Sequence, residues 1–319
     1  MARIPLCSWL GHALEILDEG GWLNRDYFAA KGPLEEGRRN WDSVSEADRM
    51  KTVALYTVLY GQWHYFSLRA FLGLLGGQSA YSDSDRPVII DLGCGPGTAT
   101  VAAMDSRLFQ GPLSSHGFDG SEAMCAFARQ ALTPLLPGAV RVEQMIFGEG
   151  GTEAALAVER ILGGCDNLEG ARACLTVSFL ISQKDATGRT LSASAAFKNM
   201  LTRLLRGLFE RGVSSVDLIG QNGIGIEPQV SNQEFDDVLA GIVGDIGLNQ
   251  VKADLTWYDV PYRVLDWDNF RALAGKVSLE ELLEQLYIEE RLRLRETWLA
   301  KAFRSSVTRV PSFTEDVPL

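Results

Sequence analysis

The sequence predicts an α/β protein built on a mainly parallel sheet, and two features of the chain carry this prediction. From residue 87 onward, short apolar runs alternate with helical patterns, which is typical of βαβ units. The first of these runs, residues 88–92, leads directly into a glycine-rich turn, as a buried parallel strand does before its helix. With 319 residues, the chain can hold such a domain and additional helices.

Five strands are expected in this region, and helical patterns separate and follow them. The expected strands are 88–92, 115–119, 139–146, 173–181 and 213–220. The expected helices are 97–108, 121–135, 151–163, 190–211 and 232–246. Two further strand-like runs, 251–258 and 262–267, are separated by three residues, which is too short for a crossover helix. We therefore expect an antiparallel hairpin at the edge of the sheet.

Helical patterns also precede and follow the sheet region. One or two short helices are expected over residues 6–30. A long helix is expected from Ser45, a capping residue, to Leu75, with Gly76-Gly77 as its stop. Charged helices are expected over residues 278–304. The resulting division is an N-terminal helical cap, a core domain and a C-terminal helical extension, over residues 1–80, 81–270 and 271–319.

Charge and composition limit the classes of partner. The formal net charge is -11, whereas a domain that grips nucleic acid usually carries a basic face. A basic run at residues 198–211 is interpreted as the solvated face of a helix, which disfavours nucleic acid without excluding RNA. The composition therefore favours a small-molecule or protein substrate and leaves a homodimer open.

Cysteine usage and hydropathy indicate a cytoplasmic protein without a membrane span. The five cysteines are scattered and show neither a CxxC pair nor metal-like spacing with the three histidines, which suits a reducing compartment. The first ten residues lack the basic start and long apolar stretch of a signal peptide. No apolar run approaches the roughly 20 residues needed to cross a bilayer.

The glycine-rich turn is the most informative motif. It reads Asp91-Leu92-Gly93-Cys94-Gly95-Pro96-Gly97 and lies at the carboxyl end of a strand, where open α/β sheets bind ligands. Glycines let the backbone turn sharply and let a ligand approach it closely. A dinucleotide fingerprint would want a further glycine at Thr98. With its GxGxG spacing and preceding acid, the segment instead resembles motif I of class I methyltransferases that use S-adenosylmethionine (SAM).

This resemblance implies a Rossmann-like, seven-stranded sheet and SAM as the cofactor. It also implies that the methionine part of SAM lies along the glycine loop and that the motif I acid contacts its amino group. These cofactor-binding roles are carried onto Asp91, Gly93, Cys94, Gly95 and Gly97.

A second segment, residues 116–124, resembles the end of the family's second strand. There the resemblance implies that Asp119 accepts hydrogen bonds from the ribose hydroxyls, a task that suits the two oxygens of a carboxylate. The alternative is that Asp119 caps the following helix, although Ser121 could do so instead. Gly120 and Ser121 are expected to line the adenosine pocket.

The family pattern is less clear after the third and fourth strands. Phe147 could pack on the adenine, and Glu149 could accept its amino group. Ser178 and Phe179 lie where the methyl group should emerge, so they could contact the ligand, or they could simply finish a buried strand. The D/N-P-P-[YFW] tetrad of nucleic-acid amino methyltransferases is absent from residues 175–183, which disfavours that chemistry.

No general base stands out, and two residues of the N-terminal region are the catalytic candidates. Tyr56, Tyr60 and His64 recur at a spacing of four and share one helix face. They could form an aromatic packing seam, or the helix could cover the SAM pocket so that Tyr60 or His64 reaches the ligand or the substrate. His116 is expected to pack within its strand. In-line methyl transfer needs no metal, and none is expected.

Three functions remain open from the sequence. A small-molecule methyltransferase is favoured by the acidic charge and the helical cap. A methyltransferase acting on RNA or protein would use the inserted and terminal helices as a docking surface. A non-catalytic module with the same fold would bind a partner chain instead.

Overall fold

The fold is centred on five parallel strands in the order β3-β2-β1-β4-β5. The computed structural model describes residues 5–23, 41–82, 85–106, 108–109, 112–145, 151–165, 168–177, 195–222, 237–238, 241, 251–262, 281 and 298–309. The strands are β1 (Val88–Leu92), β2 (Ser114–Asp119), β3 (Val140–Gln144), β4 (Arg172–Thr176) and β5 (Ser215–Asn222). The strand order reverses between β1 and β4, and such a switch point is where open α/β sheets bind ligands at the carboxyl ends of their strands.

Two strands lie antiparallel beside β5. They are β6 (Val251–Tyr262) and β7 (Trp298–Arg309), and β7 pairs with both β5 and β6. The predicted turn at residues 259–261 was wrong, because β6 runs through it and Pro261 pairs with Leu299. An edge strand tolerates proline because its missing N–H can face outward. The helix predicted over residues 298–304 was also wrong, because this segment is β7.

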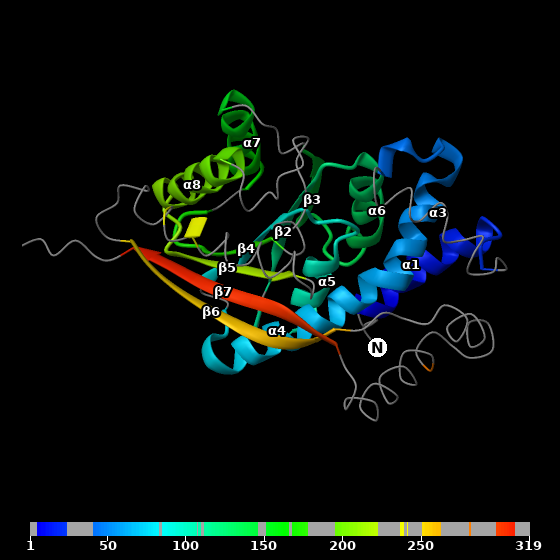
Figure 1. Cartoon of the computed structure of the whole chain (residues 1–319), viewed down its shortest axis with the longest axis horizontal. Helices are drawn as coiled ribbons and strands as arrows, with labels where there is room; N and C mark the ends of the chain where they lie inside the picture. Colours follow the sequence, from blue (N-terminus) through cyan, green and yellow to red (C-terminus); the bar gives the residue numbers. More distant parts are fainter. Residues whose placement is uncertain are drawn as a thin grey trace, which may run out of the picture.

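Helices cover the two faces of the sheet in separate groups (Figure 1). One face carries α7 (Gly151–Gly164) and α8 (Ala195–Glu210). The other carries α5 (Thr98–Met104), α6 (Glu122–Leu132) and the N-terminal helices. The strand β1 shows the division, because Ile89 faces the N-terminal group whereas Val88 and Ile90 face α7 and α8. All five residues of β1 are buried, as expected for a parallel strand covered on both faces.

The N-terminal region forms α1 (Pro5–Glu19), η1 (Trp41–Ser43), α3 (Glu46–Tyr56), η2 (Thr57–Gly61) and α4 (Gln62–Ser79). The element η2 is a π-helical segment that joins α3 to α4 without a break. The predicted stop at Gly76-Gly77 was wrong, because neither glycine adopts a positive φ and α4 continues to Ser79. Ser45 precedes α3, but its hydroxyl donates to Asp48 rather than capping a backbone N–H.

Two sets of hydrogen bonds between residues far apart in the sequence attach the N-terminal region to the sheet and to α5. Tyr81, just after α4, donates its hydroxyl to Asp217 of β5 at 2.6 Å, and Arg172 of β4 donates to the same carboxylate at 2.7 Å. At the end of α5, Asp105 accepts hydrogen bonds from the Leu6 N–H and from the Tyr65 hydroxyl. These contacts fix α1 and α4 relative to the strands that they cover.

Candidate functional site

The glycine loop follows β1 at the switch point of the sheet. Gly93, Gly95 and Gly97 all adopt positive φ values, of 73°, 52° and 89°. Side-chain-bearing residues rarely adopt this conformation, so the alternation of glycine in the sequence matches the alternation of left-handed residues in the loop. Gly97 is also crowded, because a Cβ placed there would lie 2.6 Å from Cδ1 of Leu132.

The loop uses its own backbone N–H groups internally. The N–H groups of Gly93 and Cys94 both donate to the Phe118 carbonyl, at 2.7 and 3.0 Å. Gly97 N–H donates to the Cys94 carbonyl at 2.9 Å, and Pro96 has no N–H to offer. The N–H groups of the loop itself are therefore already used within the protein. A diphosphate at such a loop would need free N–H donors.

Asp91, at the end of β1, presents an unsatisfied acceptor beside this loop. Its Oδ1 accepts a hydrogen bond of 2.5 Å from the Thr176 hydroxyl at the end of β4, so the contact spans the switch point. Its Oδ2 is buried and has no hydrogen-bond partner among the described residues. Burial, together with the nearby Asp119 charge, raises the pKa of the Asp91 carboxyl to about 7. A cationic donor such as an ammonium group would satisfy this oxygen and favour the ionised carboxylate.

Asp119, at the end of β2, organises the neighbouring turn. Its Oδ2 accepts from the Gly95 N–H and its Oδ1 accepts from the Ser121 N–H, both at 2.9 Å. Ser121 Oγ in turn accepts from the Met124 N–H, so Ser121 is the N-cap of α6. The capping alternative for Asp119 is thereby assigned to Ser121. Both oxygens of Asp119 thus accept backbone N–H groups, and a carboxylate oxygen has two lone pairs.

Two of the predicted cofactor-binding residues differ in burial: Cys94 is buried, whereas Gly120 is exposed. The Cys94 side chain is buried in the core, and a Cβ at Gly117 would lie 3.0 Å from its Sγ. A hydrogen bond with Cys125 and burial raise the pKa of the Cys94 thiol. Any contact of Cys94 with a ligand would therefore come from its main chain. Gly120 is exposed, and a Cβ there would meet nothing within 4 Å.

The aromatic residues of the N-terminal helices form a half-buried cluster. Tyr56 stacks on Tyr60 with ring centroids 5.7 Å apart and meets His64 edge-on at 6.1 Å. The Tyr56 hydroxyl lies 3.5 Å from Nδ1 of His64. On the other side, Trp41 packs edge-on against Tyr56 at 5.1 Å. The three side chains predicted to share a face therefore lie together, and Tyr60 belongs to the π segment.

Three hydrogen bonds connect the N-terminal helices to the glycine loop and to β5. The indole N–H of Trp9, on α1, donates to the Pro96 carbonyl of the glycine loop at 2.8 Å. At the end of β5, the Gln221 side chain donates to the His64 carbonyl at 2.9 Å and accepts from the Ser67 hydroxyl at 2.8 Å. The backbone of His64 thus lies at the carboxyl end of β5, on the edge of the sheet that carries the glycine loop.

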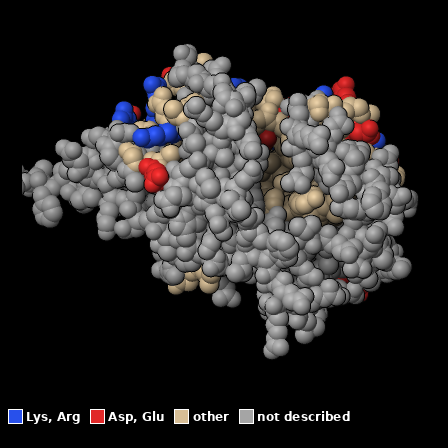
Figure 2. Space-filling view, in the orientation of Figure 1, with Lys and Arg blue, Asp and Glu red and all other residues tan. Residues whose placement is uncertain are grey.

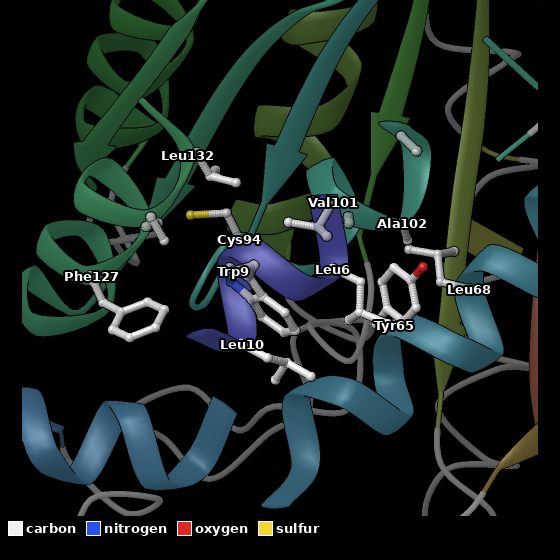
Figure 3. Packing of buried hydrophobic residues seen from close by; sticks show 14 of the residues in the cluster. Leu6, Trp9, Leu10, Tyr65, Leu68, Cys94, Val101, Ala102, Phe127 and Leu132 are labelled. Carbon is white, nitrogen blue, oxygen red and sulfur yellow. The ribbon is translucent and has the colours of Figure 1, made fainter. Parts of the chain in front are cut away.

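Packing around Trp9 joins the same elements. Figure 3 shows its ring beside Cys94, between Leu6 and Leu10 of α1, with Phe127 on one side and Tyr65 on the other. Figure 2 shows that the face viewed there is hollowed, and that both uncharged and acidic described residues are visible in the hollow. The N-terminal helices therefore pack directly on the loop that the sequence marks as the ligand site.

Several predicted site residues are not placed. Phe147, Glu149, Ser178 and Phe179 lie outside the described residues, so their roles remain predictions. His116 lies in β2 and is buried, as expected for a residue that packs within its strand.

The site also contains residues that the sequence reasoning missed. Thr176, Trp9 and Gln221 each bond to a predicted site residue or to its loop. The signal for Thr176 and Gln221 was available, because polar residues at the carboxyl ends of parallel strands are typical ligand-site residues. Trp9 had no such signal, since its partner Pro96 is 87 residues away in the chain.

Comparison with known proteins gave no sequence relative. No family model matches the chain, and no curated protein matches it. Solved structures of similar shape were found. Many of these structures are methyltransferases.

Three of these structures illustrate the identities and TM-scores that were found. The plantazolicin methyltransferase BamL, solved with a triazolic desmethylPZN analog and S-adenosylhomocysteine (SAH), is 11% identical, with a TM-score of 0.43 over 89% of this chain and 97% of that one. Magnesium protoporphyrin IX methyltransferase from Synechocystis, solved with bound SAH, is 11% identical, with a TM-score of 0.37 over 77% and 83%. A structure named as an rRNA methylase from Clostridium thermocellum is 12% identical, with a TM-score of 0.41 over 76% and 97%. At these scores the similarity assigns no role to any residue of this chain.

Within the described part of the chain, no helix is both long and apolar enough to cross a membrane.

Proposed function

We propose that this protein is a SAM-dependent methyltransferase that transfers the methyl group in line to a small molecule. The observation that carries the proposal is the buried Oδ2 of Asp91, which has no hydrogen-bond partner among the described residues and lies beside a loop whose N–H groups are already used. This combination suits a ligand that brings hydrogen-bond donors, such as the ammonium and ribose hydroxyls of SAM. A phosphate, which brings only acceptors, would not satisfy the Asp91 oxygen.

The residues of the site divide the binding task. Asp91 would hold the ammonium group, and the main chain of Gly93 to Gly97 would lie along the methionine part. Asp119 would accept from the ribose hydroxyls, with Gly120 and Ser121 beside the adenosine. Phe147, Ser178 and Phe179 remain candidates for the adenine and methyl-group ends of the pocket. The same proposal includes the Rossmann-like class of the seven-stranded sheet, with its antiparallel edge. It also includes the division of the chain into an N-terminal cap, a core domain and a C-terminal extension over residues 1–80, 81–270 and 271–319.

When bound, SAM supplies an activated methyl group on a positively charged sulfur. Transfer forms a bond between the acceptor atom and the methyl carbon, while the carbon–sulfur bond breaks and its electron pair stays on sulfur. The protein has to align the acceptor and exclude water. His64 is the candidate group for removing the acceptor's proton, and Tyr60 is the candidate for orienting the acceptor.

The preference for a small-molecule acceptor rests on the helical cover. The cluster around Tyr60 and His64 is half-buried, and α1 packs on the glycine loop through the bond from Trp9 to the Pro96 carbonyl. The alternative acceptors are RNA or protein, and the non-catalytic alternative is a module that binds SAM or a partner chain without transfer. The net charge of -11 weighs against RNA.

The test is transfer of a labelled methyl group from SAM. The full-length protein is incubated with labelled SAM and with separate small-molecule, RNA and protein fractions of a cell extract. The proposal expects label in the small-molecule fraction. Label only in RNA or protein would move the acceptor class, whereas cofactor binding without any transfer would favour the non-catalytic module.

A further inference from the structure

The π segment is held by the side chain of the residue that follows it. In an α-helix, the Gln62 N–H would donate to Val58, four residues earlier, but here it donates to Thr57, five residues earlier. The Val58 carbonyl accepts from Nε2 of the Gln62 side chain instead. Within the segment, the Thr57 hydroxyl donates to the Val53 carbonyl at 2.8 Å. Gln62 therefore stabilises the wide turn that carries Tyr60.

The same side chain leaves one strong acceptor unused. Gln62 is 0% exposed, and its Oε1 is buried without a hydrogen-bond partner among the described residues. The orientation of the carboxamide is fixed chemically, because only its NH₂ group can donate to the Val58 carbonyl. An orphaned buried carbonyl is unfavourable because it has lost its hydrogen bonds to water, so a donor that reaches it on ligand binding would recover that free energy.

The position of Gln62 relates this oxygen to the glycine loop. Gly61, the preceding residue, abuts Trp9 so closely that a Cβ would lie 3.0 Å from Cη2 of the indole. The same indole donates to the Pro96 carbonyl (Figure 3 shows Trp9 beside the loop residue Cys94). Gln62 therefore follows a residue that packs on Trp9, and Trp9 bonds to the glycine loop that begins two residues after Asp91.

We propose that Gln62 is a cofactor-contacting residue, whose Oε1 accepts a hydrogen bond from the same ligand ammonium group as Oδ2 of Asp91. The inference rests on the proposed function. An ammonium group has three N–H donors, and a buried one needs more than a single acceptor. Both oxygens are buried among the described residues, so a bound ammonium group would lie between the N-terminal helices and the loop.

The test compares two ligands that differ only in the amino-acid end. SAH carries the ammonium group, whereas 5′-methylthioadenosine lacks the whole amino-acid part. Gln62→Met keeps the length of the side chain and removes the acceptor. By calorimetry, it should weaken SAH binding about tenfold, the loss of one charge-assisted hydrogen bond, and leave 5′-methylthioadenosine binding within about twofold.

Two further variants make the result specific. Thr57→Val removes a different buried hydrogen bond from the same π segment, so it should leave the affinities for both ligands within about twofold. In an Asp91→Asn background, Gln62→Met should cost less SAH affinity than it does alone, because the two residues share one donor group. Circular dichroism confirms that each variant is folded.

Three results would overturn the inference. The first is wild-type SAH affinity in Gln62→Met. The second is an equal loss for SAH and 5′-methylthioadenosine, which would mean that Gln62 acts only through the helix. The third is strict additivity with Asp91→Asn. A wild-type protein that binds neither ligand would refute the proposed function itself, and this inference with it.

Discussion

Replacing Asp91 by Asn removes the charge at the candidate cofactor site while keeping its shape. Asn still offers an oxygen to the Thr176 hydroxyl, which now bonds to Oδ1 of Asp91 at 2.5 Å. What disappears is a charge-assisted hydrogen bond to the ligand ammonium, worth about 1.5–3 kcal/mol. Since about 1.4 kcal/mol is a factor of ten, we expect SAH affinity above pH 8 to fall about 10- to 150-fold. Isothermal titration calorimetry measures this loss directly.

The pH dependence gives the same prediction a second signature. With a pKa of about 7, Asp91 is about one-tenth ionised at pH 6 and about nine-tenths ionised at pH 8. The ratio of wild-type to variant SAH affinity should therefore rise about tenfold between these pH values. Taking the ratio removes the titration of the ligand's own amino group, which both proteins share.

As pH rises, the folding stability of the wild-type protein relative to Asp91→Asn should fall, whereas its relative SAH affinity should rise. Because the folded-state pKa of Asp91 is raised, the stability linked to its protonated form is lost as pH rises through 7. Asn does not titrate, so thermal unfolding should show the variant gaining stability relative to wild type between pH 6 and pH 8. Unchanged SAH affinity, with a flat affinity ratio across this range, would refute the assignment of Asp91 to the ammonium group.

Three further substitutions test other parts of the account. Gly97→Ala should lower the free energy of unfolding by about 1–3 kcal/mol in denaturant titrations, because φ is 89° and the added Cβ would meet Leu132. As the control, a Cβ at Gly73 in α4 meets nothing within 4 Å, so Gly73→Ala should be neutral or stabilising. Equal effects of the two substitutions would contradict the steric explanation. Arg172→Met should lower the free energy of unfolding by about 3–5 kcal/mol in the same assay, because the buried Asp217 carboxylate loses its ion pair with Arg172. As the control, Arg141→Met at an exposed ion pair should cost less than about 1 kcal/mol. A small effect of Arg172→Met would show that the buried pair is dispensable. His64→Gln should leave SAH affinity unchanged and lower kcat about 100-fold once an acceptor is known, and unchanged turnover would discard His64 as the base.

Local features of the site were predictable from the sequence. The glycine loop was, because left-handed residues at 93, 95 and 97 require glycine whatever the rest of the fold does. The N-cap of α6 was open to the same reasoning, since Ser121 makes its bond three residues along the chain. The parallel direction of the five central strands was predictable because strands and helices alternate along the chain.

What could not be predicted depends on contacts between distant residues. Trp9 reaches the loop across 87 residues, and Tyr81 reaches Asp217 across 136, so no periodicity reports either contact. The strand β7 was mistaken for a helix because its pairing with β5 and β6 overrides a charged, helix-like composition. The π segment is likewise invisible in the sequence, because one wide turn leaves the spacing of Tyr56, Tyr60 and His64 unchanged.

The central claim is that the switch point between β1 and β4 binds SAM. Calorimetric titration of SAH into the full-length protein tests it most directly, with NAD as the comparison ligand. We expect saturable binding of one SAH per chain, no binding of NAD, and a loss of SAH affinity of about 10- to 150-fold in Asp91→Asn. Absence of SAH binding, or preferential binding of NAD, would contradict it.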